Sequence, residues 1–253
     1  MTAPTDAPLN LTLQAIMTWG SWGLTAVALG VAVWWGVRTR SGFYVLVLLA
    51  AMAAAFAEPL YDIGLMLWFH TPGLWTHFSA FGIPQPNWTH SGYAILYGVP
   101  AMVITRALHE GRLDRSSFYR LAAMAFTMSC AFEMIGINGG VYQYWGPHVL
   151  RILNYPLVIG VLETAQVSCF AIAASELRRR GGEGWSLWGL FVLFPATFYL
   201  ANFGAGSSLI IALHLDPASP AAVWAGTLLS LAFATVLIRF AAAFVPRVSP
   251  SGS

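Results

Sequence analysis

Four carboxylic acids lie inside apolar stretches of this chain, where acidic side chains are uncommon. They are Glu58, Asp62, Glu133 and Glu163. A charged group at the centre of a membrane helix costs at least about 2.5 kcal/mol, so an acid placed there is expected to serve a function. Glu58 and Asp62 are four residues apart, which puts them one helical turn from each other on the same face. Two acids this close repel unless one is protonated or each has its own partner, and a shared proton makes one of them a usable general acid.

The composition of the 253-residue chain places it in a membrane. Hydrophobic residues make up 58% and charged residues only 9%, whereas charged residues account for about 25% of a typical soluble domain. All 12 basic residues are arginines, so chemistry that needs a lysine amine, such as a retinal Schiff base, is excluded. Cys130 and Cys169 provide neither a disulfide framework nor a cysteine-based zinc site. The net charge of +2 is too small to indicate a nucleic acid partner.

Apolar runs of about 20 residues predict an all-α, polytopic membrane protein with seven transmembrane helices. A polar N-terminal segment, 1–12, precedes a single membrane domain over 13–247, and 248–253 is expected to be a disordered tail. The predicted spans are 13–36, 43–69, 91–107, 118–137, 152–174, 185–213 and 221–244.

Arginine is concentrated in alternate loops, which predicts the orientation of the chain. Arginines follow the first, third, fifth and seventh spans, whereas the N-terminus and the other loops contain only Arg151. The last of these inner arginines is Arg247. Because short loops rich in arginine stay in the cytoplasm, the N-terminus is expected outside and the C-terminus in the cytoplasm. We therefore expect a multi-pass protein of a cell membrane, the bacterial inner membrane.

The predicted topology brings the four acids toward one depth. At about 1.5 Å per residue, Glu58 lies roughly 22 Å above the inner start of its helix. Glu133 reaches the same level, and Asn202 reaches a similar height on the sixth span. Glu163 is expected nearer the middle of the membrane, where Thr164 and Gln166 offer it structural partners, so it is predicted to contribute less than the other acids.

Two outer loops are rich in aromatic residues and predict a lid above this layer. Residues 71–90 contain no charge, and residues 138–151 combine Gly139 and Gly140 with several rings. We expect an apolar, substrate-binding pocket lined by Trp68, Trp75, Tyr142, Tyr144, Trp145, Tyr199 and Asn202. The alternative for any single ring is the aromatic belt found at membrane interfaces.

Buried acids beneath aromatic rings favour acid-base chemistry on a lipophilic molecule, with Glu58, Asp62, Glu133 and Glu163 as catalytic residues. One acid donates a proton, a second carboxylate takes one back, and ring faces stabilise a passing cation. No cofactor is expected, because neither paired membrane histidines for haem nor a glycine-rich nucleotide loop is present. A metal site formed by His70, His77 and His90 with Asp62 is the competing idea, but their spacing matches no tight ligand motif.

Several short motifs carry a resemblance to a known family. Residues 58–68 read EPLYDIGLMLW, and they are followed by FGIPQP at 81–86, EMIG at 133–136 and GVYQY at 140–144. This pattern resembles the AveC-like spirocyclase family of actinobacterial membrane proteins. The resemblance implies a membrane enzyme that forms cyclic ethers, such as spiroketals, from a polyketide-type precursor without a redox cofactor. The architecture is also similar to that of small membrane-bound terpene cyclases, which use a pair of acidic residues to protonate an epoxide or alkene.

The leading interpretation is thus a cofactor-independent cyclase or isomerase of a polyketide- or terpenoid-type substrate. Its expected partners are that lipophilic small molecule and membrane lipid, with no nucleic acid. The alternative is a non-enzymatic lipid- or small-molecule-binding protein or a proton-coupled transporter, in which the same acids bind a proton or a cationic ligand. Against transport, the sequence contains no inverted repeat and no matching pair of broken helices.

Overall fold

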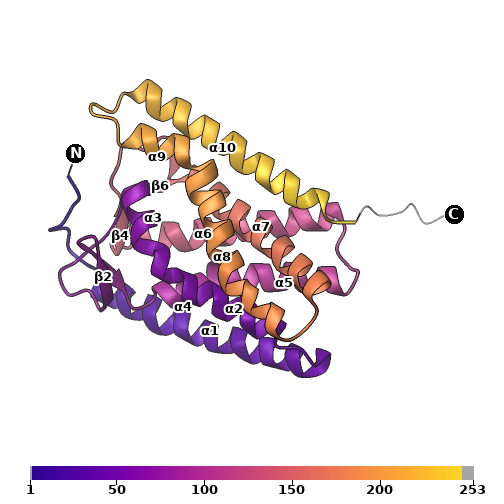
Figure 1. Cartoon of the computed structure of the whole chain (residues 1–253). Coiled ribbons are helices and arrows are strands. Elements are labelled where there is room, and N and C mark those ends of the chain that lie inside the picture. Colours follow the sequence, from indigo (N-terminus) through magenta and orange to yellow (C-terminus); the bar gives the residue numbers. More distant parts are fainter. Residues whose placement is uncertain (1, 247–253) are drawn as a thin grey trace.

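The computed structural model describes residues 2–246 as a bundle of long helices with short strands at one end (Figure 1). Arg247 and the predicted tail lie outside the described residues. Within the described part, six helical stretches are long and apolar enough to cross a membrane. They are α1 (Leu11–Thr39), Phe43–Leu65, α6 (Arg115–Asn138), α7 (Leu157–Gly181), Trp185–Ala205 and α10 (Pro220–Ala243).

The remaining predicted span, 91–107, corresponds to a helical segment built from three pieces. These are α4 (Thr89–Tyr93), a π-helical turn η2 (Ala94–Gly98) and α5 (Val99–His109). The amide of Val99 bonds the carbonyl of Ala94, five residues back, and Pro100 has no amide hydrogen to continue the regular pattern. Pro100 thus lies next to a widened helical turn, and Tyr93 and Tyr97 are located at this turn.

A second proline shapes the helix that contains Glu58. Phe43–Leu65 consists of α2 (Phe43–Ala54), a 3₁₀ turn η1 (Ala55–Ala57) and α3 (Glu58–Leu65). The carbonyl of Ala55 would accept from residue 59 in an α-helix, but Pro59 cannot donate, and the carbonyl accepts from Glu58 instead. Glu58 therefore lies at a break in the helix. The helix ends at Leu65 because Met66 adopts a left-handed conformation, so the predicted extension to residue 69 is wrong.

The stretch Trp185–Ala205 is also interrupted. It comprises a 3₁₀ turn η3 (Trp185–Gly189), α8 (Leu190–Phe198) and a second π-helical turn η4 (Tyr199–Ala205), after which α9 (Ser207–Leu213) follows. Asn202 lies inside this π-helical turn.

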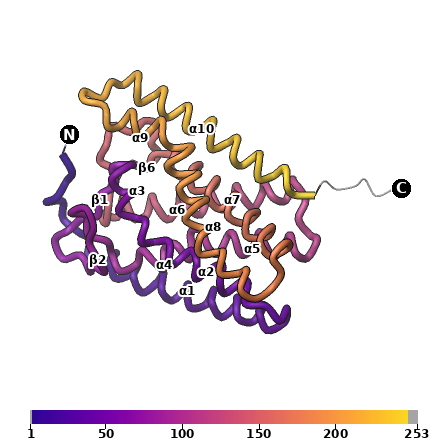
Figure 2. Tube along the Cα trace, viewed as in Figure 1, coloured from indigo at the N-terminus to yellow at the C-terminus, as the bar shows by residue number. Residues whose placement is uncertain are grey.

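Among residues 2–246, three small antiparallel sheets lie at the end of the bundle near the N-terminus, opposite the C-terminal end (Figures 1 and 2). β1 (Leu67–Phe69) pairs with β4 (Tyr142–Tyr144), which is far away in the sequence. β2 (Thr76–Ala80) pairs with β3 (Ile83–Pro86), and β5 (Arg151–Ile152) pairs with β6 (Tyr155–Pro156). The predicted aromatic loops therefore contain ordered strands.

Helix α7 is the core of the bundle. In the most apolar 18-residue part of α7, 78% of the residues are buried. The buried share of the corresponding part is 28% in α10 and 33% in α1. In Figure 2, α1 and α10 lie at opposite edges with α7 between them. The outer helices expose large apolar side chains such as Trp19, Val27 and Phe233, as expected for surfaces that face lipid.

Candidate active site

Three of the four predicted acids line one buried cavity below β1 and β4. Glu58, Glu133 and Glu163 come from α3, α6 and α7 and are at most 8% exposed. The cavity measures about 40 Å³, which is room for a few water molecules. A lipophilic substrate can enter only if side chains or strands that line the cavity move.

Glu163 is the centre of the polar network in this cavity. Its Oε1 accepts hydrogen bonds from the hydroxyls of Tyr97 at 3.0 Å and Tyr61 at 3.4 Å. Its Oε2 accepts from Tyr155 at 3.3 Å and from Ser129. A carboxylate has about four acceptor positions, so these four donors can satisfy an ionised Glu163. The expectation that Glu163 contributes less to turnover than the other acids stays a prediction.

A chain of hydroxyls connects Glu163 to Glu133. The Tyr144 hydroxyl lies 3.4 Å from Glu133 Oε2 and 3.3 Å from the Tyr61 hydroxyl, which in turn contacts Glu163. Tyrosine hydroxyls both donate and accept hydrogen bonds. Glu133, Tyr144, Tyr61 and Glu163 therefore form a continuous path along which a proton can move.

Glu58 has one donor, the Tyr93 hydroxyl, at 2.5 Å from its Oε2. Tyr93 and Tyr97 are one turn apart at the π-helical turn η2, and their ring centroids are 4.9 Å apart. The widened turn thus presents both hydroxyls to acids on other helices, Tyr93 to Glu58 and Tyr97 to Glu163.

The sheet formed by β1 and β4 is the roof of the cavity. Leu67 pairs with Tyr144 and Phe69 pairs with Tyr142, and all four side chains line the cavity because alternate residues of a strand share a face. The Tyr142 hydroxyl is buried with no partner within the described residues. It lies close to the Glu133 carboxyl group, the acceptor nearest to hand.

A glycine of α6 allows the roof to approach the helix. A Cβ atom on Gly136 would lie 2.5 Å from Cζ and Oη of Tyr142, closer than nonbonded atoms pack. Gly136 is one turn after Glu133, so the Tyr142 ring lies on the helix next to the acid. A larger residue at this position would displace the ring.

Asp62, the fourth predicted acid, does not line the cavity. Its Oδ2 accepts a 2.5 Å hydrogen bond from Gln85 Nε2 of strand β3, and both side chains are almost fully buried. This bond ties the hairpin of β2 and β3 to α3. The structure thus places Asp62 outside the set of residues that line the cavity and gives it a positioning contact.

Five of the seven predicted substrate-binding residues also lie away from the cavity, and only Tyr142 and Tyr144 line it. Trp68 alternates with Leu67 and Phe69 on β1, so it faces away from the cavity. Trp75 and Tyr199 are exposed, by 45% and 38%. The amide of Asn202 bonds the Phe198 carbonyl in its own helix. Trp145 follows the end of β4, and its backbone amide bonds the carbonyl of Met66.

The hydroxyl donors of the network were not predicted from the sequence. They are Tyr61, Tyr93, Tyr97, Tyr155 and Ser129. A signal for two of them was present, because Tyr93 and Tyr97 are polar-tipped residues one turn apart inside an apolar run. Tyr61 lies next to Asp62, and Ser129 lies one turn before Glu133 on α6.

The histidines considered as metal ligands do not converge. The rings of His77 and His90 are 4.9 Å apart, but His70 Nδ1 lies against the carbonyls of Pro8 and Gly140. Within residues 2–246, no group of three or more His, Cys, Asp or Glu side chains is arranged to hold a metal ion.

No basic side chain is among the residues that line the cavity. The nearest candidate in the sequence, Arg151, donates instead to carbonyls of its own loop, including Tyr144 at 2.9 Å and Gly146 at 2.7 Å. In the same loop, burial and then Arg151 lower the pKa of His148 to about 3. His148 is thus neutral and donates from Nε2 to the Leu65 carbonyl at 2.9 Å.

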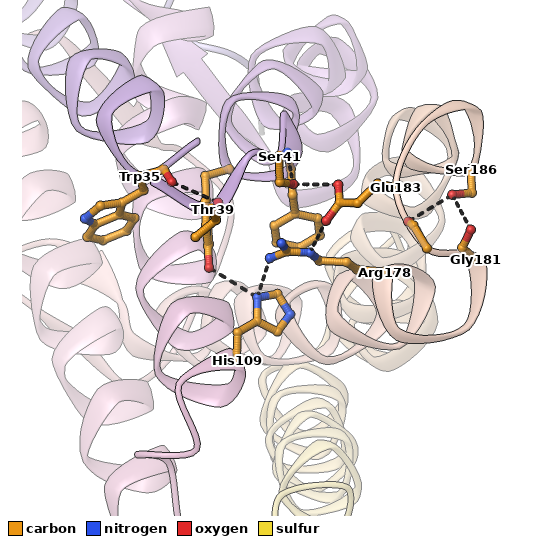
Figure 3. A network of polar contacts seen from close by, with 11 residues as sticks. Trp35, Thr39, Ser41, His109, Arg178, Gly181, Glu183 and Ser186 are labelled. Carbon is orange, nitrogen blue, oxygen red and sulfur yellow. Dashed lines mark hydrogen bonds and ion pairs between the residues drawn. The ribbon is translucent and has the colours of Figure 1, made fainter. Parts of the chain in front are cut away.

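The opposite end of the bundle contains a separate polar network (Figure 3). Glu183 accepts from Ser41 at 2.6 Å and from Arg178 at 2.8 Å, and Arg178 also donates to His109 Nδ1 at 2.8 Å. A ring nitrogen that accepts a hydrogen bond carries no proton, so the His109 ring is neutral. The contacts join α5, α7 and the loop before α2, and none of these residues lines the cavity.

No protein-family model, no curated protein and no solved structure matches this chain, so its function has to be inferred from the cavity itself.

Proposed function

We propose that this chain is a membrane-embedded, cofactor-independent cyclase or isomerase that acts on a lipophilic polyketide- or terpenoid-type substrate. The observation that carries the proposal is the cavity, in which three buried carboxyl groups meet a set of tyrosine hydroxyls without a basic side chain. The resemblance of its motifs to the AveC-like spirocyclases points to the same chemistry. In this proposal the enzyme is located in a bacterial inner membrane.

The proposal includes seven membrane crossings with the N-terminus outside. The segment 89–109 is the additional crossing, because at about 1.5 Å per residue its helical turns span roughly 30 Å, the thickness of a hydrocarbon core. The arginines at the ends of α1, α5 and α7 then face the cytoplasm and the roofed cavity faces outward. Reporter fusions should place Thr76 outside and Arg112 inside, and a cytoplasmic Thr76 would contradict this orientation.

The hydrogen bonds suggest different roles for the three acids. Glu163 accepts four hydroxyl donors, which stabilise a carboxylate, so we assign it the role of proton acceptor. Glu58 and Glu133 each accept one tyrosine hydroxyl, and we assign proton donation to this pair. Because buried carboxylates repel, a proton held by one of them lowers the energy of the whole site.

The proposed reaction conserves every atom. A carboxylic acid donates its proton to an alkene, an epoxide oxygen or a carbonyl oxygen of the substrate, which becomes cationic. An internal alkene or hydroxyl attacks this cation and forms the ring, and Glu163 takes up the proton that is then lost. Ring closure of a polyene or epoxide leaves the mass unchanged. A dihydroxyketone first closes to a hemiketal; a second protonation, on the hemiketal hydroxyl, releases it as water, and the second hydroxyl then attacks the cation and loses its proton to give the spiroketal.

The test is turnover by the purified protein without added cofactor. Lipophilic epoxides, polyenes and dihydroxyketones are incubated with the protein, and mass spectrometry detects isomers or products that have lost water. Glu133→Gln and Glu163→Gln should each lose on the order of 10²-fold or more in turnover, as expected for general acid-base groups. Glu176→Gln, at the arginine-rich end and outside the cavity, is the matched control. Wild-type turnover by both cavity variants would overturn the proposed function.

A further inference from the structure

Two adjoining hollows lie between α5 and α6, outside the cavity described above. The first measures about 670 Å³ and lies at the arginine-rich end, where charged and polar side chains line it together with apolar ones. The second measures about 210 Å³ and is lined only by apolar side chains, among them Val99 and Met128. Val103, Leu121 and Met124 line both hollows, so together they form one groove along the two helices.

The polar half of the groove has an excess of positive charge. Arg106, Arg112 and Arg120 line it, and Glu110 is its one acidic residue. Glu110 bonds both Arg106 Nε and Arg112 Nη2. One carboxylate against three guanidinium groups leaves a net charge of +2. Arg106 Nη1 is buried without a partner in the described residues, so it has a hydrogen bond left to donate.

The arginines are held in place by neighbouring side chains. The Arg106 guanidinium lies over the Trp35 ring, 4.8 Å from its centroid, and Arg120 Nη2 donates to Ser117 Oγ at 2.8 Å. Guanidinium groups with fixed planes are suited to bidentate bonds with phosphate oxygens.

The apolar half of the groove is open to the surroundings of the bundle. Met124 is 66% exposed and Val103 is 37% exposed. The groove residues on α6 run from Ser117 to Met128, which is about 16 Å of helix at about 1.5 Å per residue. A ligand that satisfies both halves must have an anionic head at the arginine-rich end and an apolar chain that follows the helices toward the bilayer interior.

We propose that this groove binds an anionic phospholipid of the surrounding bilayer. The phosphate and its headgroup contact Arg106, Arg112 and Arg120, and one acyl chain lies against Val103, Met124 and Met128. Basic sites at the inner ends of membrane helices favour anionic headgroups, and here the single carboxylate of Glu110 leaves part of the arginine charge uncompensated near the membrane surface. The site is independent of the acids in the cavity, so it does not rest on the proposed enzymatic function.

Binding is tested on the delipidated full-length protein with phosphatidylglycerol and phosphatidylcholine of identical acyl chains. Retained lipid is counted by native mass spectrometry, and affinity is measured by thermal shift in detergent. Phosphatidylglycerol should bind more tightly, and the triple variant Arg106→Gln, Arg112→Gln, Arg120→Gln should lose roughly 100-fold in affinity for it, about fivefold per arginine.

Two controls separate a specific groove from general attraction. The triple variant Arg40→Gln, Arg179→Gln, Arg180→Gln removes the same charge at the same end but outside the groove, and it should lose much less affinity. Met124→Trp fills the apolar half at an exposed position and leaves every arginine in place, so it should weaken lipid binding without unfolding the protein. Equal losses in the two triple variants, or equal binding of the two lipids by the wild type, would overturn the proposal. Glycerol phosphate, which lacks acyl chains, should not compete; competition at equal concentration would show an anion site and contradict a lipid site.

Discussion

Replacement of Gly136 by alanine tests whether Tyr142 roofs the cavity. The added Cβ would lie 2.5 Å from Cζ and Oη of Tyr142, whereas carbon atoms pack at about 3.5 Å or more. The ring must therefore move by roughly 1 Å, away from α6 and from Glu133. Overpacking of this kind costs about 1 to 3 kcal/mol.

Exposed helical glycines supply the matched control. A Cβ atom added to Gly23 or Gly30 of α1 would have no neighbouring atom within 4 Å, so alanine there meets open space. Alanine is also the better helix former, by about 1 kcal/mol. The Tm of Gly136→Ala should thus be roughly 2 to 12 °C lower than the Tm of Gly23→Ala, since 1 kcal/mol shifts the Tm of a chain of this size by about 2 to 4 °C.

The assay is thermal unfolding in detergent, followed by tryptophan fluorescence. A double variant, Gly136→Ala with Tyr142→Ala, removes the ring that the new methyl group meets. The double variant should therefore lose less stability than the sum of the losses in the two single variants. Equal midpoints for Gly136→Ala and Gly23→Ala, or strict additivity in the double variant, would refute the position of Tyr142 over α6.

Three further predictions concern the acids and the outer loops. His148 has a folded-state pKa of about 3, below its ordinary 6.5, so only the unfolded chain takes up this proton as the pH falls below 6.5. Between pH 7.5 and pH 5 the wild type should lose about 2 kcal/mol more stability than His148→Gln, and identical pH profiles in thermal unfolding would contradict the burial of a neutral ring. Asp62→Ala should release Gln85 and expose the β2–β3 hairpin to limited proteolysis, whereas Asp62→Asn keeps a hydrogen-bonding partner and should stay protected; equal cleavage of the two variants would argue against the tether. A lipophilic tertiary amine, cationic at neutral pH, should raise the Tm of the wild type and not that of Glu163→Gln, because it pairs with the ionised Glu163 carboxylate; an equal rise in both would place its binding elsewhere.

Part of the site could be predicted from the sequence because the cost of burying a carboxyl group is large and local. Glu58, Glu133 and Glu163 stand out in apolar runs, and a uniform rise per helical residue is enough to bring them near one level. The same reasoning failed to separate Asp62 from Glu58. Their spacing indicates one helix face, but the partner of Asp62 is Gln85, which comes from a loop whose path cannot be derived from helical periodicity.

The sheet of β1 and β4 above the cavity shows a different limit of prediction from the sequence. Tyr142 and Tyr144 were expected to line the site, and so was Trp68, since aromatic composition treats all three alike. The pairing of β1 with β4 decides between them, because strand alternation points Leu67 and Phe69 into the cavity and Trp68 away from it. Contact between two three-residue strands more than 70 positions apart leaves no periodic signal in either strand.

The tyrosines of the network were missed for a related reason. A tyrosine in a membrane helix is most simply interpreted as an interface residue with its hydroxyl in water. Tyr61 and Tyr155 instead direct their hydroxyls at Glu163 from separate elements. Only the packing of those elements around α7 turns these isolated residues into one network.

The path through Tyr144 and Tyr61 has a consequence for how the site would be reset between turnovers. When a reaction ends, the donor has lost its proton and the acceptor has gained one. The two groups have then exchanged their protonation states. With Glu133 and Glu163 joined by two hydroxyls, each hydroxyl can pass on one proton as it receives another. The starting state would then be regenerated inside the protein, without a proton exchanged with bulk water.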